Sequence, residues 1–186
     1  MNAIARQKES LQNGENIMSK KPLIVDPSLY DVDKPIATIE DIRKYNRQRY
    51  EMEQLTGILY DSFEEKKCVG YKDMTENEFW VRGHMPDFPL TPGVVLCEVA
   101  AQLASYFTTK HRMFGDDAVM GFAGLEEVKF RGMVRPGSRV IVQSEMLKWR
   151  KILVTAKFMC VVDDDFVCEG VLKGFPLPID ESNKDA

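Results

Sequence analysis

The chain has 186 residues, of which 44% are hydrophobic, and a formal net charge of −4. This length suits one globular domain with a full core, and the net charge provides no basic surface for nucleic acid. No apolar run reaches the ~18 residues that span a membrane, and the start lacks the apolar core of a signal peptide. We therefore expect a cytoplasmic protein with one folded domain.

The two ends of the chain lack the pattern of a packed structure. Residues 1–21 are polar and are expected to be disordered, or to be an artefact of an early start codon. Residues 22–49 form an N-terminal extension, in which Thr38 and Asp41 resemble a capped helix start. The extension is expected to cover an open sheet edge or a neighbouring subunit. Residues 177–186 form an acidic tail that is expected to fray.

Between these ends, residues 50–176 have the pattern of an α+β domain with strands on both sides of one helix. Before the helix, short β-rich runs predict three strands of an antiparallel meander, at 58–60, 67–72 and 78–81. After it, longer runs separated by turns predict four more strands, at 118–131, 138–149, 151–162 and 166–175. This order indicates an antiparallel sheet wrapped around one long central helix.

The predicted helix follows a stiff loop, residues 83–91, whose prolines fix φ and remove backbone donors. Pro92 suits the first turn of a helix, so the helix is expected to begin near Pro92 or Gly93. It is apolar almost all round, as is typical of a buried helix. The free N–H groups near Gly93 and Val94 would favour developing negative charge there.

Polar side chains on this helix and in the loop before it are candidates for chemistry. Glu98 and Gln102 lie one turn apart in a narrow sector of the apolar helix, and a buried carboxylate needs a partner or serves a site. His84 is one of two histidines, and histidine titrates near neutral pH without help. Taken singly, such residues are more often structural than catalytic. Gln102 in particular would orient Glu98 or satisfy a backbone group.

One continuous run closely resembles the active-site signature of the hotdog-fold 3-hydroxyacyl-ACP dehydratases. The signature reads His-Phe-Pro, two residues, Pro, two residues, Pro-Gly-Val-Leu, two residues, Glu. The run is His84-Met85-Pro86-Asp87-Phe88-Pro89-Leu90-Thr91-Pro92-Gly93-Val94-Val95-Leu96-Cys97-Glu98. It departs from the family at Met85 and Thr91, which touch pocket lining and so bear on chain-length preference. The resemblance extends over roughly residues 50–175.

The resemblance implies a hotdog fold and the dehydration of 3-hydroxyacyl-ACP to trans-2-enoyl-ACP, without a metal or an organic cofactor. It implies that His84 is the base, that Glu98 is the acid, and that Gly93 and Val94 bind the carbonyl oxygen, with Pro92 and Gln102 in support. The implied partners are an acyl carrier protein and a second copy that shares the active sites. A trimer of such dimers is a further assembly of the family.

Two alternatives share the fold. A hotdog acyl thioesterase would place its carboxylate and water differently, and a non-catalytic acyl-binding subunit would have lost His or Glu. The intact spacing from His84 to Glu98 counts against both. The four cysteines have neither metal-ligand spacing nor the density of a disulfide scaffold, so all four are expected to be reduced thiols.

Overall fold

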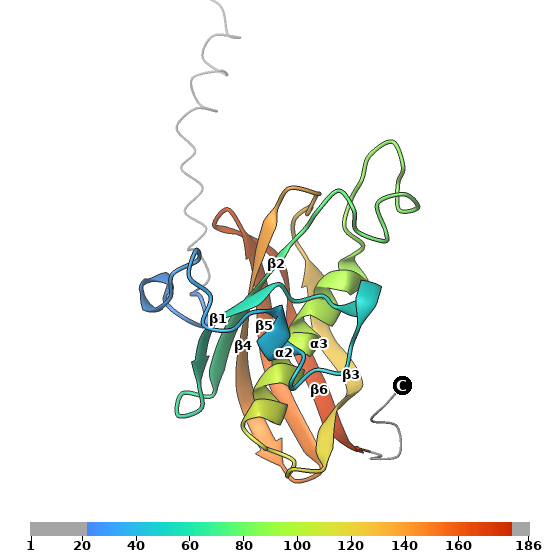
Figure 1. The fold of residues 1–186 in the computed structure, drawn as a ribbon. Coiled ribbons are helices and arrows are strands. Elements are labelled where there is room, and N and C mark those ends of the chain that lie inside the picture. Colours follow the sequence, from blue (N-terminus) through green and yellow to red (C-terminus); the bar gives the residue numbers. More distant parts are fainter. Residues whose placement is uncertain (1–21, 180–186) are drawn as a thin grey trace, which may run out of the picture.

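The computed structural model describes residues 22–179, in which an antiparallel sheet wraps along one long helix (Figure 1). The helix, α3, spans Gly93–Lys110 and has Pro92 as its N-cap, as predicted. The expectations for residues 1–21 and 180–186 lie outside the described residues. The strands are β1 (Gly57–Ser62), β2 (Lys67–Asp73), β3 (Ala118–Phe130), β4 (Arg139–Arg150), β5 (Leu153–Val162) and β6 (Asp165–Pro178).

The strand order across this six-stranded sheet is β1-β2-β4-β5-β6-β3. Every neighbouring pair is antiparallel. Between β2 and β3 the chain passes through α3 and crosses to the far edge of the sheet, so β1 and β3 form its two edges. The predicted α+β architecture, one antiparallel sheet around a central helix, is confirmed.

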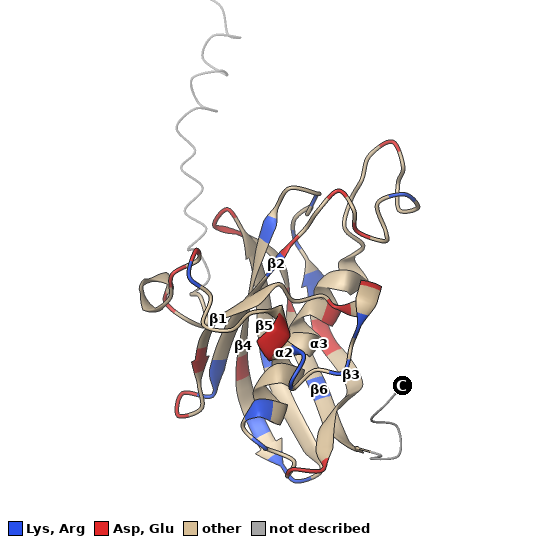
Figure 2. Ribbon diagram, in the orientation of Figure 1, with Lys and Arg blue, Asp and Glu red and all other residues tan. Residues whose placement is uncertain are grey.

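Helix α3 is apolar because the sheet buries it along most of its length. Val99, Leu103 and Phe107, one turn apart, are each 0% exposed and pack in one cluster with Val142 of β4 and Ala156 of β5. Fully burying such a large apolar side chain contributes about 1.5–3 kcal/mol. Figure 2 shows the consequence, since the ribbon of α3 is largely free of charged residues. The position of the helix is therefore fixed by its core face.

The four cysteines are all buried, and the structure joins none of them by a disulfide. Cys160 of β5 lies opposite Cys168 of β6 in the strand register. A hydrogen bond with Cys160 raises the pKa of the Cys168 thiol to about 12, and burial adds to the shift. Because the thiolate is the reactive form, the Cys168 thiol should be inert at neutral pH.

The prediction of a third strand before the helix, at 78–81, is wrong. Glu78–Val81 instead forms consecutive turns, in which Val81 N–H donates to Glu78 O and His84 N–H donates to Trp80 O. The exposed Phe79 and the buried Trp80 alternate as they would in a strand. Within residues 22–179, however, no strand pairs with them, so the segment forms hydrogen bonds within itself and leads into the loop at His84.

The prediction that residues 177–186 fray is wrong for their described part. Strand β6 continues through Leu177 to Pro178, and these residues pair with Val119 and Ala118 of β3. Ile179 N–H then donates to Asp117 O. The long edge strand β3 thus provides a partner that the acidic sequence did not reveal.

The N-terminal extension packs against both an edge and a face of the sheet. Its short helix α2 (Ile39–Ile42) has the predicted capping box between Thr38 and Asp41, while Ala37 bridges to Ile58 of the edge strand β1. Further upstream, Val25 is buried with Leu59, Val69 and Met159 on the face of the sheet opposite α3. Two 3-10 turns interrupt the extension, η1 (Pro27–Leu29) and η2 (Tyr50–Met52). Ala37 thus lies at the open edge of the sheet and Val25 lies on its face, so the path of the extension is more folded than predicted.

Candidate active site

His84 lies in the loop that leads into α3, and one ring contact fixes its proton. Its Nδ1 atom lies 2.7 Å from the carbonyl oxygen of Leu90. A carbonyl oxygen can only accept a hydrogen bond, so Nδ1 carries the proton, and the neutral ring keeps its lone pair on Nε2. The contact with Leu90 therefore leaves Nε2 of His84 as the ring nitrogen that is not bound by the loop.

The first turn of α3 places backbone donors beside this imidazole. The N–H groups of Gly93 and Val94 have no acceptor within the helix, and a helix N-terminus favours negative charge. His84, Pro92, Gly93 and Val94 line one pocket of about 420 Å³. The structure thus brings together the expected base and the expected oxyanion donors.

Glu98 lies farther along α3, half-buried, where Gln102 holds one of its oxygens. Nε2 of Gln102 donates to Oε1 of Glu98 over 2.7 Å, and Gln102 itself is 2% exposed. Oε2 of Glu98 has no hydrogen-bond partner within residues 22–179. The carboxyl group is therefore anchored through one oxygen, and the other remains available to a substrate.

Within one chain, His84 and Glu98 do not line the same pocket. Glu98 lines a second pocket of about 200 Å³, together with Met52 and Phe79. Val94 is 73% exposed and lines both pockets. The exposed first turn of α3 thus lies between the base candidate and the acid candidate of a single chain.

Sequence reasoning missed the contribution of Phe130 to this region. A Cβ atom built on Gly93 would lie 2.7 Å from a ring carbon of Phe130, which is the last residue of β3. The space that a side chain at Gly93 would need is therefore occupied by an aromatic ring of the same chain. The sequence shows an aromatic residue at the end of a predicted strand, but it does not show that the ring lies beside Gly93.

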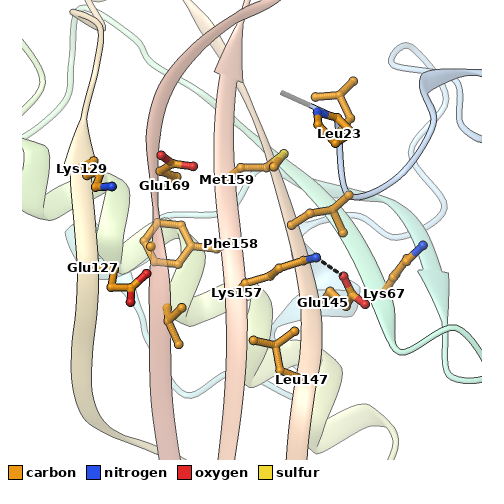
Figure 3. A pocket seen from close by; sticks show the side chains of 14 residues that line it. Leu23, Lys67, Glu127, Lys129, Glu145, Leu147, Lys157, Phe158, Met159 and Glu169 are labelled. Atoms are coloured by element: carbon orange, nitrogen blue, oxygen red, sulfur yellow. Dashed lines mark ion pairs between the residues drawn. The ribbon is translucent and has the colours of Figure 1, made fainter. Parts of the chain in front are cut away.

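Another pocket, of about 480 Å³, lies on the face of the sheet opposite α3, and Figure 3 shows its charged side chains. Lys157 of β5 and Glu145 of β4 form an ion pair there over 2.6 Å. Glu169 of β6, at the other side of the pocket, pairs with Arg131. These charges neutralise one another, and neither His84 nor Glu98 reaches the pocket, so the chemistry is not placed here.

The described part of the chain has neither a cluster of metal-ligating side chains nor a helix that could span a membrane. Among residues 22–179, no group of three or more His, Cys, Asp or Glu side chains could hold a metal ion. In the same range, no helix is long and apolar enough to cross a membrane.

An antiparallel sheet around one buried helix, with His84 before the helix and Glu98 on it, defines a hotdog-type protein with acid and base candidates. Residues 46–171 match the family model described as FabA-like domain. The chain is 31% identical over 141 residues to the 3-hydroxyacyl-[acyl-carrier-protein] dehydratase FabZ of Francisella tularensis subsp. novicida, which covers 70% of this chain and 86% of the relative. The chain therefore belongs to the FabA-like family.

A second relative and two solved structures agree with this assignment. FabZ of Francisella philomiragia subsp. philomiragia is 29% identical over 155 residues, covering 78% of this chain and 95% of the relative. The dehydratase heterocomplex ApeI:P from Xenorhabdus doucetiae is similar with a TM-score of 0.61, at 15% identity, over 76% of this chain and 92% of that one. Thioesterase superfamily member 2 from Mus musculus has a TM-score of 0.50, at 11% identity, over 67% and 83%. At these identities the structures support the hotdog fold alone.

Proposed function

We propose that this protein dehydrates 3-hydroxyacyl thioesters on an acyl carrier protein to trans-2-enoyl thioesters, as the names of its FabZ relatives describe for those proteins. The observation that carries the proposal is that two side chains, His84 and Glu98, are each anchored through one atom only. His84 is tied through Nδ1 and keeps Nε2, while Glu98 is tied through Oε1 and keeps Oε2. A base and an acid held in this way suit proton removal at one carbon and proton donation at the next.

In the proposed reaction, Nε2 of His84 takes a proton from the carbon α to the thioester carbonyl. The electron pair of that C–H bond forms the new C=C bond as the β C–O bond breaks. Glu98 donates a proton to the leaving hydroxyl, directly or through water, so that water departs and no electrons are exchanged with a redox partner. The N–H groups of Gly93 and Val94 hold the carbonyl oxygen while it is enolate-like.

The proposed active site is shared between two copies, with His84 of one chain facing the partner's Glu98. Two observations on a single chain support this arrangement. His84 and Glu98 line different pockets, which are separated by the exposed Val94. In addition, β3 is a long edge strand with exposed Phe122 and Phe130, and such an edge is commonly covered by a second copy. A trimer of these dimers, in the cytoplasm, is the assembly that the family suggests.

An acyl carrier protein is acidic, and its docking needs local positive charge. Arg82 is exposed in the turns before His84, and it has no ion-pair partner within residues 22–179. Arg135 lies 3.7 Å above the ring of Phe88 in the loop after His84. By contrast, Arg43 and Lys44 of the extension already pair with Glu53 and Asp41. We therefore propose that Arg82 and Arg135 attract the carrier.

The activity is tested by incubating the protein with 3-hydroxyacyl and enoyl thioesters while both conjugated-enoyl absorbance and free thiol are followed. A change in absorbance without thiol release is expected of the dehydratase. Thiol release without a change in absorbance would instead identify a thioesterase. If neither signal changes for carrier-bound substrates of several chain lengths, the proposed activity is wrong.

The shared site is tested by unfolding inactive His84→Ala and Glu98→Gln proteins together and refolding them as a mixture. Half of the dimers in a random mixture are mixed, and each has one site with both changes and one site with neither. Roughly 25% of the wild-type activity should then return by two-fold symmetry. Mixed dimers that form but remain inactive would contradict the shared site while leaving both residues free to be catalytic.

A further inference from the structure

Residues 46–54, here called the N-terminal arm, meet α3 at Gln102. The side chain of Asn46 donates to the backbone oxygen of Gln102 over 2.9 Å. The backbone N–H of Gln54 donates to Oε1 of Gln102 over 2.8 Å, and Nε2 of Gln102 donates to the backbone oxygen of Met52 over 2.6 Å. The remaining hydrogen on Nε2 is directed to Glu98. Both hydrogens on Nε2 and one lone pair on Oε1 of this buried amide are therefore bound by the arm and Glu98.

The arm decides which way round the Gln102 amide lies. If the amide were rotated by 180°, its NH₂ group would face the N–H of Gln54, and its oxygen would face the carbonyl of Met52. Both contacts would be repulsive, because a backbone N–H can only donate and a carbonyl can only accept. Two backbone groups of the arm thus force Gln102 to present a donor to Glu98.

This donor has a consequence for the carboxyl group. Oε1 of Glu98 accepts the hydrogen bond from Gln102 whether Glu98 is ionised or protonated. A proton on Glu98 must therefore reside on Oε2, which has no other partner within residues 22–179. We infer that the arm, acting through Gln102, positions the acidic proton of Glu98 on the oxygen that meets the substrate. This inference rests on the proposed function and gives the segment before β1 a part in it.

The chain contains a matched control for this network. Gln143 of β4 is 1% exposed, and its Oε1 accepts the N–H of Val25 over 2.9 Å. Its Nε2 donates to the oxygen of Val25 over 3.2 Å and to the hydroxyl of Tyr30 over 3.1 Å. Gln143 thus anchors another part of the extension by the same kinds of bonds, on the face of the sheet opposite α3. It has no bond to Glu98.

The kinetic test compares Gln102→Met with Gln143→Met, because methionine has nearly the same length and none of these hydrogen bonds. We expect both variants to melt at a lower temperature than the wild type. Only Gln102→Met should lose kcat, by about 10-fold to 100-fold, with KM within about 2-fold, because a misplaced catalytic group costs up to about 100-fold. In the arm itself, Asn46→Leu should lower kcat more than the matched change Tyr30→Phe. Equal kcat losses in the two methionine variants, or no loss in either, would overturn the inference.

A second readout does not depend on activity. Hydrogen exchange at the Gln54 N–H should be at least about 10-fold faster in Gln102→Met than in the wild type, and unchanged in Gln143→Met. The Val25 N–H should behave in the reverse way. If the wild type fails to hydrate a crotonoyl thioester of N-acetylcysteamine or of carrier protein, the proposed function is at fault, and exchange still judges the arm. Unchanged exchange at Gln54 in Gln102→Met would overturn the arm's hold on Gln102.

Discussion

A histidine and a carboxylate accompany each end of α3, but among residues 22–179 only the pair at the C-terminal end is in contact within one chain. At the C-terminal end, Asp61 of β1 is 3% exposed at its side chain and lies 2.7 Å from both Lys110 Nζ and His111 Nε2. The rings of Phe63 and Phe107 pack on His111 with centroids 5.0 Å and 4.6 Å away. The Lys110 cation in the last turn also suits the helix dipole. These groups satisfy one another.

At the N-terminal end, the histidine and the carboxylate each have a single anchor and a free atom that faces a pocket. His84 is bound by a backbone carbonyl, and Glu98 is bound by an amide. The neighbouring Val94 is exposed rather than packed. A histidine beside a carboxylate is structural when neighbouring groups satisfy both side chains, as at His111 and Asp61. It becomes a candidate for catalysis when the fold leaves one nitrogen and one oxygen unpaired.

The largest effect is expected from changes at His84 and Glu98, near the N-terminal end of α3. His84→Ala and Glu98→Gln should each lower turnover by ~100-fold to 10,000-fold, because general acid and base groups contribute about that much. Both proteins should remain folded, as neither side chain is part of the core. The measurement is hydration of an enoyl thioester by protein whose circular dichroism matches that of the wild type. Near-normal rates in either variant would remove the proposed mechanism.

A change at the C-terminal end of α3, where Asp61 contacts Lys110 and His111, should lower the stability of the protein rather than its turnover. Asp61→Asn removes the charge that holds Lys110 and His111, and hydrogen bonds to charged groups contribute about 1.5–3 kcal/mol each. The partial exposure of Lys110 reduces this cost, so we expect a loss of about 1–3 kcal/mol in the free energy of unfolding. Urea denaturation measures it, while kcat should stay within about 2-fold. A collapse of kcat in folded protein would show that the two ends are coupled.

The pH dependence of stability sharpens the contrast further. Burial alone would lower the pKa of Lys110, but hydrogen bonds to Asp61 and Tyr106 outweigh it and raise the pKa above its ordinary value of 10.5. A raised pKa stabilises the fold fully below the unfolded value and loses its effect as pH rises through the folded value. The difference in melting temperature between wild type and Lys110→Met should therefore be largest below about pH 10 and shrink above it. A difference that grows with alkaline pH would contradict the assignment.

The smallest effect is expected for His111→Ala. Asp61 keeps its ion pair with Lys110 in this variant, so the carboxylate is not left alone. Some packing against Phe63 and Phe107 is lost, and the melting temperature should fall by less than in Asp61→Asn. Turnover should be unchanged in the same enoyl hydration assay. A loss of turnover as large as in His84→Ala would show that both histidines are needed for activity and would contradict the structural role of His111.

Much of the fold followed from local chemistry. The start of α3 at Gly93 was predictable because Pro92 tolerates the first turn and an apolar run follows it. The capping box of Thr38 and Asp41 was predictable from spacing alone. The four strands after the helix have their predicted places, because turn residues separate long apolar runs. The candidate pair of His84 and Glu98 was reached through the resemblance of one continuous run.

The features that the sequence did not predict all depend on a distant partner. In Glu78–Val81, exposed and buried side chains alternate as in a strand, but no neighbouring strand lies beside them within residues 22–179. Leu177 lies in a segment that was expected to fray, yet it pairs with β3. The same holds for Asp61, which meets His111 from 50 residues away, and for Gln102, which meets the backbone of the arm. The propensity of a segment to form a helix or a strand depends on its own side chains, and it determined where the helix and most of the strands lie. Backbone N–H and C=O groups are alike at almost every residue, so only tertiary structure decides which of them a buried side chain meets.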